Sequence, residues 1–323
     1  MSTRRLGERG PTVGAMGLGC MTMSPSYGPG DADEGMATMA EALARGVTFF
    51  DTANSYARGA NEELVGAFVR DHREEVVLAS KLGLWSLDEG RRIDGRPETV
   101  GPACDASLKR LGVDHIDVYY LHRVDPEVPV EETVGAMAEL VAAGKVHQLG
   151  LSEPTVDELR RGHMVHPLAV VQLEWSLWAR GAEAELVPTA RELGIGIVPF
   201  GPLGRGFLTG ALDGGRDDMT EADLRRTDPR LQGEHLAENR RLVIQLGQIA
   251  EELGATPAQT ALAWVFAQGD DVVPIPGMEK RAFLDENLGA LTLDLGESLQ
   301  RLDDVFAVGV TAGDPDEVLL RRR

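Results

Sequence analysis

The chain has 323 residues, of which 43% are hydrophobic and 26% are charged. Both values are near those of folded soluble proteins, so they exclude a wholly disordered chain. The 52 acidic and 32 basic side chains give a net charge of −20, which is the wrong sign for a general binder of nucleic acid or of an anionic membrane.

The cysteine content and the apolar runs predict a cytoplasmic protein. Cys20 and Cys104 are the two cysteines, too few for a disulfide framework. Residues 1–14 contain no apolar stretch of signal-peptide length. The apolar runs, such as 194–200, are far shorter than the roughly 20 residues that span a bilayer.

Short apolar segments recur along the chain, and each predicts a β-strand. Most are apolar throughout rather than alternating, which is typical of parallel strands that are covered on both faces. The eight segments are 15–19, 47–50, 76–80, 116–121, 146–151, 169–173, 195–200 and 272–275.

Segments with helical periodicity separate these strands. Several end at a glycine suited to a left-handed cap, namely Gly46, Gly144, Gly194 and Gly254. The predicted helices cover 34–45, 62–70, 100–111, 131–143, 183–193 and 236–253.

This alternation predicts an α/β fold in which residues 1–323 form one (β/α)8 TIM barrel domain with extra C-terminal helices. The alternative, a doubly wound sheet, requires G-x-G-x-x-G after the first strand, and residues 17–22 lack the third glycine. Residues 4–13 predict an N-terminal β-hairpin that covers the barrel floor. Residues 213–233 predict a long irregular loop after the seventh strand.

Four ionisable side chains follow three successive predicted strands. Asp51 and Tyr56 follow the second strand, Lys81 the third and His122 the fourth. Each alone could be an ordinary rim residue. Because the carboxyl ends of barrel strands converge on one face, the four side chains together predict an active site there.

The chemistry of these groups suits proton transfer. A tyrosine with a pKa of about 10 exchanges protons near neutrality only if its phenolate is stabilised. Lowering that pKa by about two units takes roughly 2.7 kcal/mol, which a partly buried Lys81 near Tyr56 could supply. Asp51 would keep Lys81 charged, and a neutral His122 could orient a substrate oxygen.

Ordered motifs along the chain resemble those of the aldo-keto reductase superfamily. They are FFDTANSY (49–56), NEELVG (61–66), ASK (79–81), DVYYLH (117–122), GLSE (150–153), VPFGPLGRGFLTG (198–210), IPG (275–277) and ENL (286–288). LGCMTMS (18–24) and YGP (27–29) resemble a bacterial subgroup. The resemblance implies an NAD(P)H-dependent carbonyl reductase in which Tyr56 is the general acid, Lys81 and Asp51 tune it, and His122 orients the carbonyl.

The resemblance also implies a cofactor site. Ser152 and Gln172 would bind the nicotinamide carboxamide, Trp175 would stack on its ring, and the loop 201–206 would hold the pyrophosphate with Arg205. The full set of predicted cofactor contacts is Cys20, Met21, Ser152, Gln172, Trp175, Gly201, Leu203, Gly204, Arg205, Gly206, Gly277, Met278, Lys280, Arg281, Glu286 and Asn287.

Two segments depart from the family pattern. Glu153 stands where relatives have asparagine. Met278, Glu279 and Phe283 stand where relatives grip the 2′-phosphate of NADPH with a hydroxyl and cations. Lys280 and Arg281 could turn inward to replace those cations. The resemblance implies NADPH as the cofactor, with NADH possible because of Glu279.

The substrate pocket is expected to include Tyr27, Trp85 and His122, with Trp178 and the loop 213–233 nearby. The partner is a small carbonyl substrate of open identity, and the oligomeric state is open. No metal is expected, because His163 and His166 are too sparse and are better suited to a helix end. The alternatives are a cofactor-binding regulatory or redox-sensing module with little turnover and a metal-dependent hydrolase on the same barrel.

Overall fold

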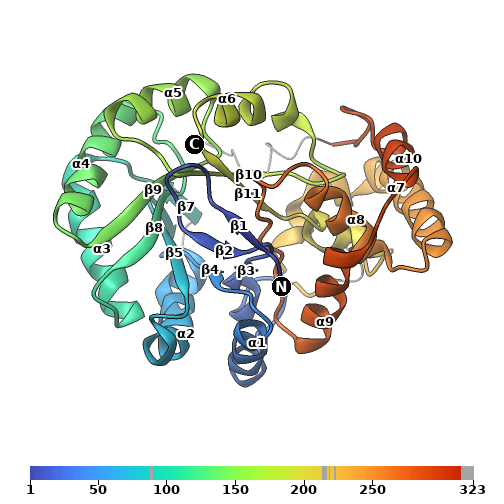
Figure 1. Cartoon of the computed structure of the whole chain (residues 1–323), viewed down its shortest axis with the longest axis horizontal. Helices are drawn as coiled ribbons and strands as arrows, with labels where there is room; N and C mark the ends of the chain where they lie inside the picture. The colour runs from blue at the N-terminus through green and yellow to red at the C-terminus, as the bar shows by residue number, and fades with distance from the viewer. Residues whose placement is uncertain (88–89, 213–216, 218, 222, 314–323) are drawn as a thin grey trace.

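The computed structural model describes residues 1–87, 90–212, 217, 219–221 and 223–313. Its centre is a parallel sheet that curves into a barrel (Figure 1). In spatial order the strands are β3 (Leu18–Gly19), β4 (Phe49–Asp51), β5 (Val77–Leu82), β8 (Ile116–Leu121), β9 (Val146–Ser152), β10 (Val170–Glu174) and β11 (Gly196–Phe200).

The eighth predicted strand closes the barrel between β11 and β3. It forms isolated parallel bridges instead of a continuous ladder, because Pro274 and Pro276 have no N–H to donate. The closing hydrogen bonds run from Val273 N–H to Ile197 O (2.9 Å), Ile275 N–H to Pro199 O (3.0 Å), Gly17 N–H to Pro274 O (2.9 Å) and Gly19 N–H to Pro276 O (3.0 Å). The (β/α)8 prediction is confirmed.

Helices surround the barrel, and α7 and α10 lie at its outer edge (Figure 1). The helices are α1 (Ala32–Ala44), α2 (Ala60–Val69), α3 (Pro97–Leu111), α4 (Val130–Ala142), α5 (Val156–Val165), α6 (Leu186–Glu192), α7 (Gly233–Glu252), α8 (Pro257–Phe266), α9 (Arg281–Gly289) and α10 (Ser298–Val305). The predicted extra C-terminal helices are present. The buried α8 was not predicted, since eight of its ten residues are buried and it shows no polar face. No described helix has the length and apolar character needed to cross a membrane.

The N-terminal hairpin lies across the barrel floor, as predicted. Strand β1 (Thr3–Arg5) pairs antiparallel with β2 (Thr12–Gly14). Leu6 and Val13 are buried and pack with inward-facing strand residues such as Phe49 and Tyr120. The Arg4 guanidinium donates to Val272 O at 2.6 Å and so ties the hairpin to the closing strand.

Gly7 of this hairpin meets the barrel backbone with no room for a side chain. Its φ is +69°, and an added Cβ would lie 2.4 Å from Gly196 N and 2.7 Å from Gly194 O. We therefore expect Gly7→Ala to lower the free energy of unfolding by about 3 kcal/mol, from left-handed strain and overpacking together.

Urea denaturation measures this effect, and Gly247→Ala is the matched control. Gly247 lies inside α7, and an added Cβ would meet nothing within 4 Å. Its replacement is expected to raise stability by about 0.5–1 kcal/mol. A Gly7→Ala variant as stable as the wild type would show that the hairpin is not packed on the floor.

A second hairpin, which the sequence patterns did not predict, stands at the opposite end of the barrel. Strand β6 (Leu84–Leu87) pairs antiparallel with β7 (Gly90–Ile93), between β5 and α3. The Ser86 hydroxyl donates to Ser55 O at 2.9 Å. The hairpin therefore lies beside the segment that follows β4.

Candidate active site

The carboxyl ends of β4, β5 and β8 bring the four predicted catalytic residues together. Asp51 ends β4, Lys81 lies on β5 and His122 follows β8. Lys81 Nζ donates to the Asp51 carboxylate, to Thr52 O at 2.9 Å and to Tyr56 Oη at 3.1 Å. Lys81, Asp51 and His122 are buried, while Tyr56 is partly exposed. A solvent-reachable phenol thus contacts a buried ion pair.

Lys81 remains an ammonium in this setting. Burial alone would lower its pKa, but Asp51 and Tyr56 outweigh burial and raise the pKa above its usual value. The second oxygen of Asp51 accepts a hydrogen bond from Gln172 Nε2 at 2.9 Å. The carboxylate is therefore held on both sides, and the ammonium is fixed beside the phenol.

His122 stays neutral beside this pair. Its ring stands edge-on to Tyr56, with centroids 5.8 Å apart at 86°. Burial, together with the nearby charges of Arg123, Lys81 and Arg91, holds the pKa of His122 well below its ordinary value. A neutral imidazole can donate a hydrogen bond to a carbonyl oxygen placed near Tyr56 Oη.

This depressed pKa has a consequence for stability. His122 binds a proton in the unfolded chain below about pH 6.5 but not in the folded one, so acidification favours unfolding. Lowering the pH from 7.5 to 5.5 should therefore lower the free energy of unfolding by about 1.4 kcal/mol through His122. We expect His122→Gln to reduce the pH-dependent loss by that amount, as measured by urea denaturation at both pH values. Equal losses in the two proteins would contradict a neutral His122.

Ser152 lies beside a residue that the sequence patterns did not single out. Its hydroxyl accepts a hydrogen bond from the Arg123 guanidinium at 3.0 Å. Arg123 follows directly after His122, and the motif that ends at the histidine gave no signal for it. Ser152 and Gln172 therefore both face the catalytic cluster, from β9 and β10.

Trp175 lies in the core rather than beside the barrel mouth. It is 1% exposed, its Nε1 donates to Glu183 at 2.9 Å, and its ring meets Trp264 edge-on. Side chains on β10 alternate in direction, so Gln172 and Glu174 share one face while Trp175 falls on the other. This position gives no support to the predicted stacking on a cofactor, and Glu174 occupies the inward position instead.

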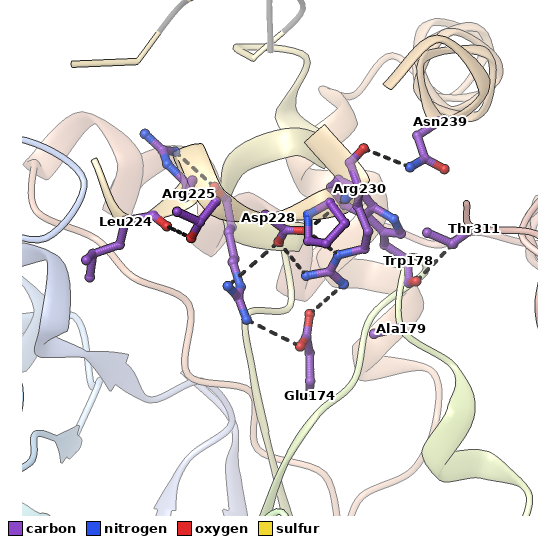
Figure 2. Close-up of polar contacts among 12 residues, drawn as sticks. Glu174, Trp178, Ala179, Leu224, Arg225, Asp228, Arg230, Asn239 and Thr311 are labelled. Carbon is purple, nitrogen blue, oxygen red and sulfur yellow. Dashed lines mark hydrogen bonds and ion pairs between the residues drawn. The ribbon is translucent and has the colours of Figure 1, made fainter. Parts of the chain in front are cut away.

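Glu174 belongs to a buried charge network that covers the loop 201–206. The Arg230 guanidinium binds both Glu174 and Asp228 at 2.9 Å (Figure 2). Arg205, which was expected to face a pyrophosphate, lies 3.6 Å from Glu174 and 3.7 Å from Asp228. The 3₁₀ helices η7 (Leu224–Thr227) and η8 (Pro229–Leu231) carry this network. Of the predicted loop 213–233, residues 213–216, 218 and 222 lie outside the described residues.

The loop itself has the backbone expected of an anion cradle. Gly201, Gly204 and Gly206 have positive φ, and so does Arg205 at 55°. Glycine adopts this conformation freely, whereas at Arg205 it carries strain. Leu203 precedes the turn and is partly buried. Successive left-handed residues turn backbone N–H groups toward one side, which suits a phosphate.

The segment after the closing strand offers few free cations. Arg281 is bound to Glu34 through its side chain at 2.9 Å and its backbone N–H at 3.0 Å. Lys280 is exposed and lies 5.5 Å from the ring centre of Phe283. Met278 is buried in the core and Glu279 is partly exposed. The negative charge of Glu279 therefore borders this part of the site.

Several buried polar atoms at this end of the barrel have no partner within the described residues. They include Thr22 Oγ1, both side-chain atoms of Asn54, and Asn287 Nδ2. Buried donors and acceptors are normally paired, so unpaired ones next to a strand exit mark a place for a polar ligand. Asn287 is a predicted adenine contact, and Glu286 beside it is partly exposed. The donor set fits a dinucleotide.

The remaining predicted positions differ in exposure. Cys20 is fully buried, and burial raises the pKa of its thiol, so it is a core residue. Met21 is partly exposed, and Gly277 pairs with Gly19 in the closing bridge.

Of the predicted substrate-pocket residues, Trp85 and Tyr27 are partly exposed, and Arg225 lies 4.4 Å from the Tyr27 ring centre. Trp178, by contrast, is 4% exposed and packs against Phe207.

Histidines occur away from this site as well. His115, Asp117 and His147 form a cluster that could hold a metal ion, at the amino ends of β8 and β9. Asp117 there already pairs with Arg73 at 2.8 Å. The cluster lies at the opposite end of the strands from the catalytic residues. His163, whose Nδ1 accepts from Leu168 N–H, lies in α5, and His166 caps its end.

Comparisons with known proteins agree with this geometry. The model of the aldo/keto reductase family matches residues 15–305. A protein of Glycine max, "Probable aldo-keto reductase 1", is 45% identical over 313 residues, which cover 96% of this chain and 90% of the relative. A glycerol dehydrogenase from Gluconobacter oxydans superposes with a TM-score of 0.85 at 27% identity over 97% of both chains. A thermostable aldo-keto reductase gives 0.75 at 28% identity, over 94% of this chain and all of that one.

Proposed function

Because the chain belongs to the aldo-keto reductase family, we propose that it is a nicotinamide-dependent oxidoreductase that reduces a small aldehyde or ketone to an alcohol. The observation that carries this proposal is the position of Lys81 Nζ, which contacts both Asp51 and Tyr56 Oη. Family membership itself supports oxidoreductase chemistry on carbonyl compounds.

In this proposal each of the four clustered residues has a separate role in the reduction. Tyr56 Oη protonates the oxygen of the substrate as negative charge develops there, and the Lys81 ammonium stabilises the resulting phenolate. Asp51 keeps that ammonium charged. The neutral His122 donates a hydrogen bond to the carbonyl oxygen and sets its orientation. A bound reduced nicotinamide supplies the hydride.

We propose that the cofactor lies along the strand ends, between Gln172 and the segment after the closing strand. Ser152 and Gln172 would bind the carboxamide, the loop 201–206 the pyrophosphate, and Asn287 the adenine. This placement is supported by the left-handed loop and by the unpaired Asn287 Nδ2. NADPH is the proposed cofactor, with NADH as the rival because of Glu279.

The choice between the two cofactors depends on the charge of Glu279. A carboxylate near a 2′-phosphate repels it, while NADH carries no such phosphate. We expect Glu279→Gln to raise the ratio of kcat/KM for NADPH to that for NADH by about three- to tenfold. Steady-state kinetics with both cofactors measures the ratio. Glu297→Gln, at an exposed position outside this segment, is the control and should leave it unchanged.

The direct test of the proposed function is cofactor oxidation. The protein is mixed with NADPH or NADH and a panel of aromatic and aliphatic aldehydes, and the reduced-nicotinamide absorbance is followed. Turnover with an alcohol product is the expected result. Tight cofactor binding without turnover on the whole panel would instead support a regulatory module.

A further inference from the structure

Two arginines are among the buried residues that the structure describes, and they differ in their partners. Arg230 is 1% exposed and binds two carboxylates, Glu174 and Asp228, at 2.9 Å. Arg123 is 9% exposed and forms no ion pair with any residue of the described ranges. Burying an unpaired charge is costly. The chain has a net charge of −20, yet no carboxylate of the described residues pairs with Arg123.

The hydrogen bonds of Arg123 leave part of its guanidinium unused. One terminal nitrogen, Nη1, donates to His122 O at 2.6 Å and to Ser152 Oγ at 3.0 Å. The other two nitrogens, Nε and Nη2, donate to no residue within the described part of the chain. Nε and Nη2 form one edge of the planar fork, which matches the two oxygens of a carboxylate.

The residues around the guanidinium of Arg123 are the proposed catalytic residues and their neighbours. Arg123 follows His122 directly, and the charges of Tyr56, Glu153 and Glu174 act on its pKa, which burial lowers. Arg91 on the β6–β7 hairpin adds a second positive charge close enough to act on both His122 and Arg123. Glu153 is turned toward β10, where its Oε1 accepts from Glu174 N–H at 2.6 Å. The charges that act on the His122 ring are thus positive, those of Arg123, Lys81 and Arg91.

We infer that Arg123 selects substrates whose carbonyl carbon lies close to a carboxylate. The carbonyl oxygen would lie between Tyr56 Oη and His122, and the carboxylate would bind the free Nε and Nη2 edge of Arg123. This inference rests on the proposed function, since it assigns the substrate class of the same site. Arg91 would raise the local concentration of the anionic substrate without contacting it.

Matched substrate pairs test the inference. Phenylglyoxylate is compared with its methyl ester, and pyruvate with its methyl ester, because in each acid the carboxylate adjoins the carbonyl carbon and each pair differs mainly in charge. We expect the wild-type kcat/KM to favour each carboxylate over its ester by at least about tenfold. In Arg123→Gln this preference should fall to near unity, mainly through KM. Arg123→Lys keeps the charge but loses the fork, so an intermediate preference is expected.

A binding measurement distinguishes a role of Arg123 in binding the carboxylate from a general effect of the substitution on turnover. Isothermal titration with mandelate, the product of the first acid, should give at least about tenfold weaker binding to Arg123→Gln than to the wild type. The methyl ester of that product should bind the two proteins alike. Arg92→Gln, on the same hairpin and paired with Asp94 at 3.2 Å, is the control and should keep the wild-type preference.

The outcomes are distinguishable from failure of the proposed function. Absence of turnover on any carbonyl compound would count against the proposed function, whereas the titration would still report on Arg123. Equal turnover of acids and esters by the wild type would overturn the inference and leave the function standing. An Arg123→Gln variant that binds NADPH more weakly but keeps the wild-type substrate preference would also overturn the inference, because Arg123 would then bind the cofactor.

Discussion

Replacing Tyr56 by phenylalanine is expected to lower kcat/KM for carbonyl reduction by about 10² to 10⁴-fold. The variant loses the hydroxyl that contacts Lys81 of the buried Lys81–Asp51 pair, on a residue that is partly exposed. Nothing else within the described cluster can deliver a proton from the same place. Cofactor oxidation with an aromatic aldehyde measures the loss.

The control is another tyrosine to phenylalanine change in the same barrel. Tyr119 is fully buried on β8, with its side chain in the core. Tyr119→Phe should keep the activity within about twofold, because the ring keeps its volume and its packing in the core. Unchanged activity in Tyr56→Phe would remove Tyr56 from the mechanism. Retained quenching of tryptophan fluorescence by NADPH would show that the variant still binds cofactor.

Replacing Arg230 by methionine should lower the free energy of unfolding by about 3–5 kcal/mol. The change leaves Glu174 and Asp228 buried without their main partner (Figure 2). Burial alone would raise the pKa of Asp228, but Arg230 and Arg205 outweigh burial and hold that pKa below its ordinary value, so Asp228 is a carboxylate at neutral pH. Urea denaturation at pH 7.5 measures the difference.

The control for Arg230 is an exposed ion pair of similar geometry. Arg301 on α10 binds Glu252 at 2.5 Å, with both side chains about half exposed. Arg301→Met should cost no more than about 1 kcal/mol, because solvent screens an exposed pair. Losses of the same size in both variants would mean that burial does not govern the strength of the Arg230 network.

The sequence predicted the barrel well because buried parallel strands leave a simple apolar signal. It also predicted that Asp51, Tyr56, Lys81 and His122 lie close together, since they follow neighbouring strands whose carboxyl ends converge. The β6–β7 hairpin was missed because each strand has only four residues and β7 is polar, with arginines at 91 and 92. Helix α8 was missed because a helix that is apolar on all sides has no periodicity.

The polar network around the cofactor loop could not be predicted from the sequence. Arg205 was expected to help hold a pyrophosphate. Glu174 and Asp228, 31 residues before it and 23 after it in the chain, converge on it in space. Long-range pairs of this kind leave no local pattern. The burial of Trp175 against Trp264, a residue far along the chain, likewise leaves no local pattern in the sequence.

The prolines of the closing strand have a consequence for how the barrel assembles. Residues 17 and 274 meet across this seam, so it joins the two ends of the chain and carries the largest loop-closure cost of any strand pair. Until the seam forms, the edge that later faces β3 exposes carbonyl oxygens at Pro274 and Pro276 but no N–H groups there. An open sheet with such an edge is a poor template for the strand of another molecule. The residues that interrupt the finished ladder thus protect the unfinished barrel from aggregation.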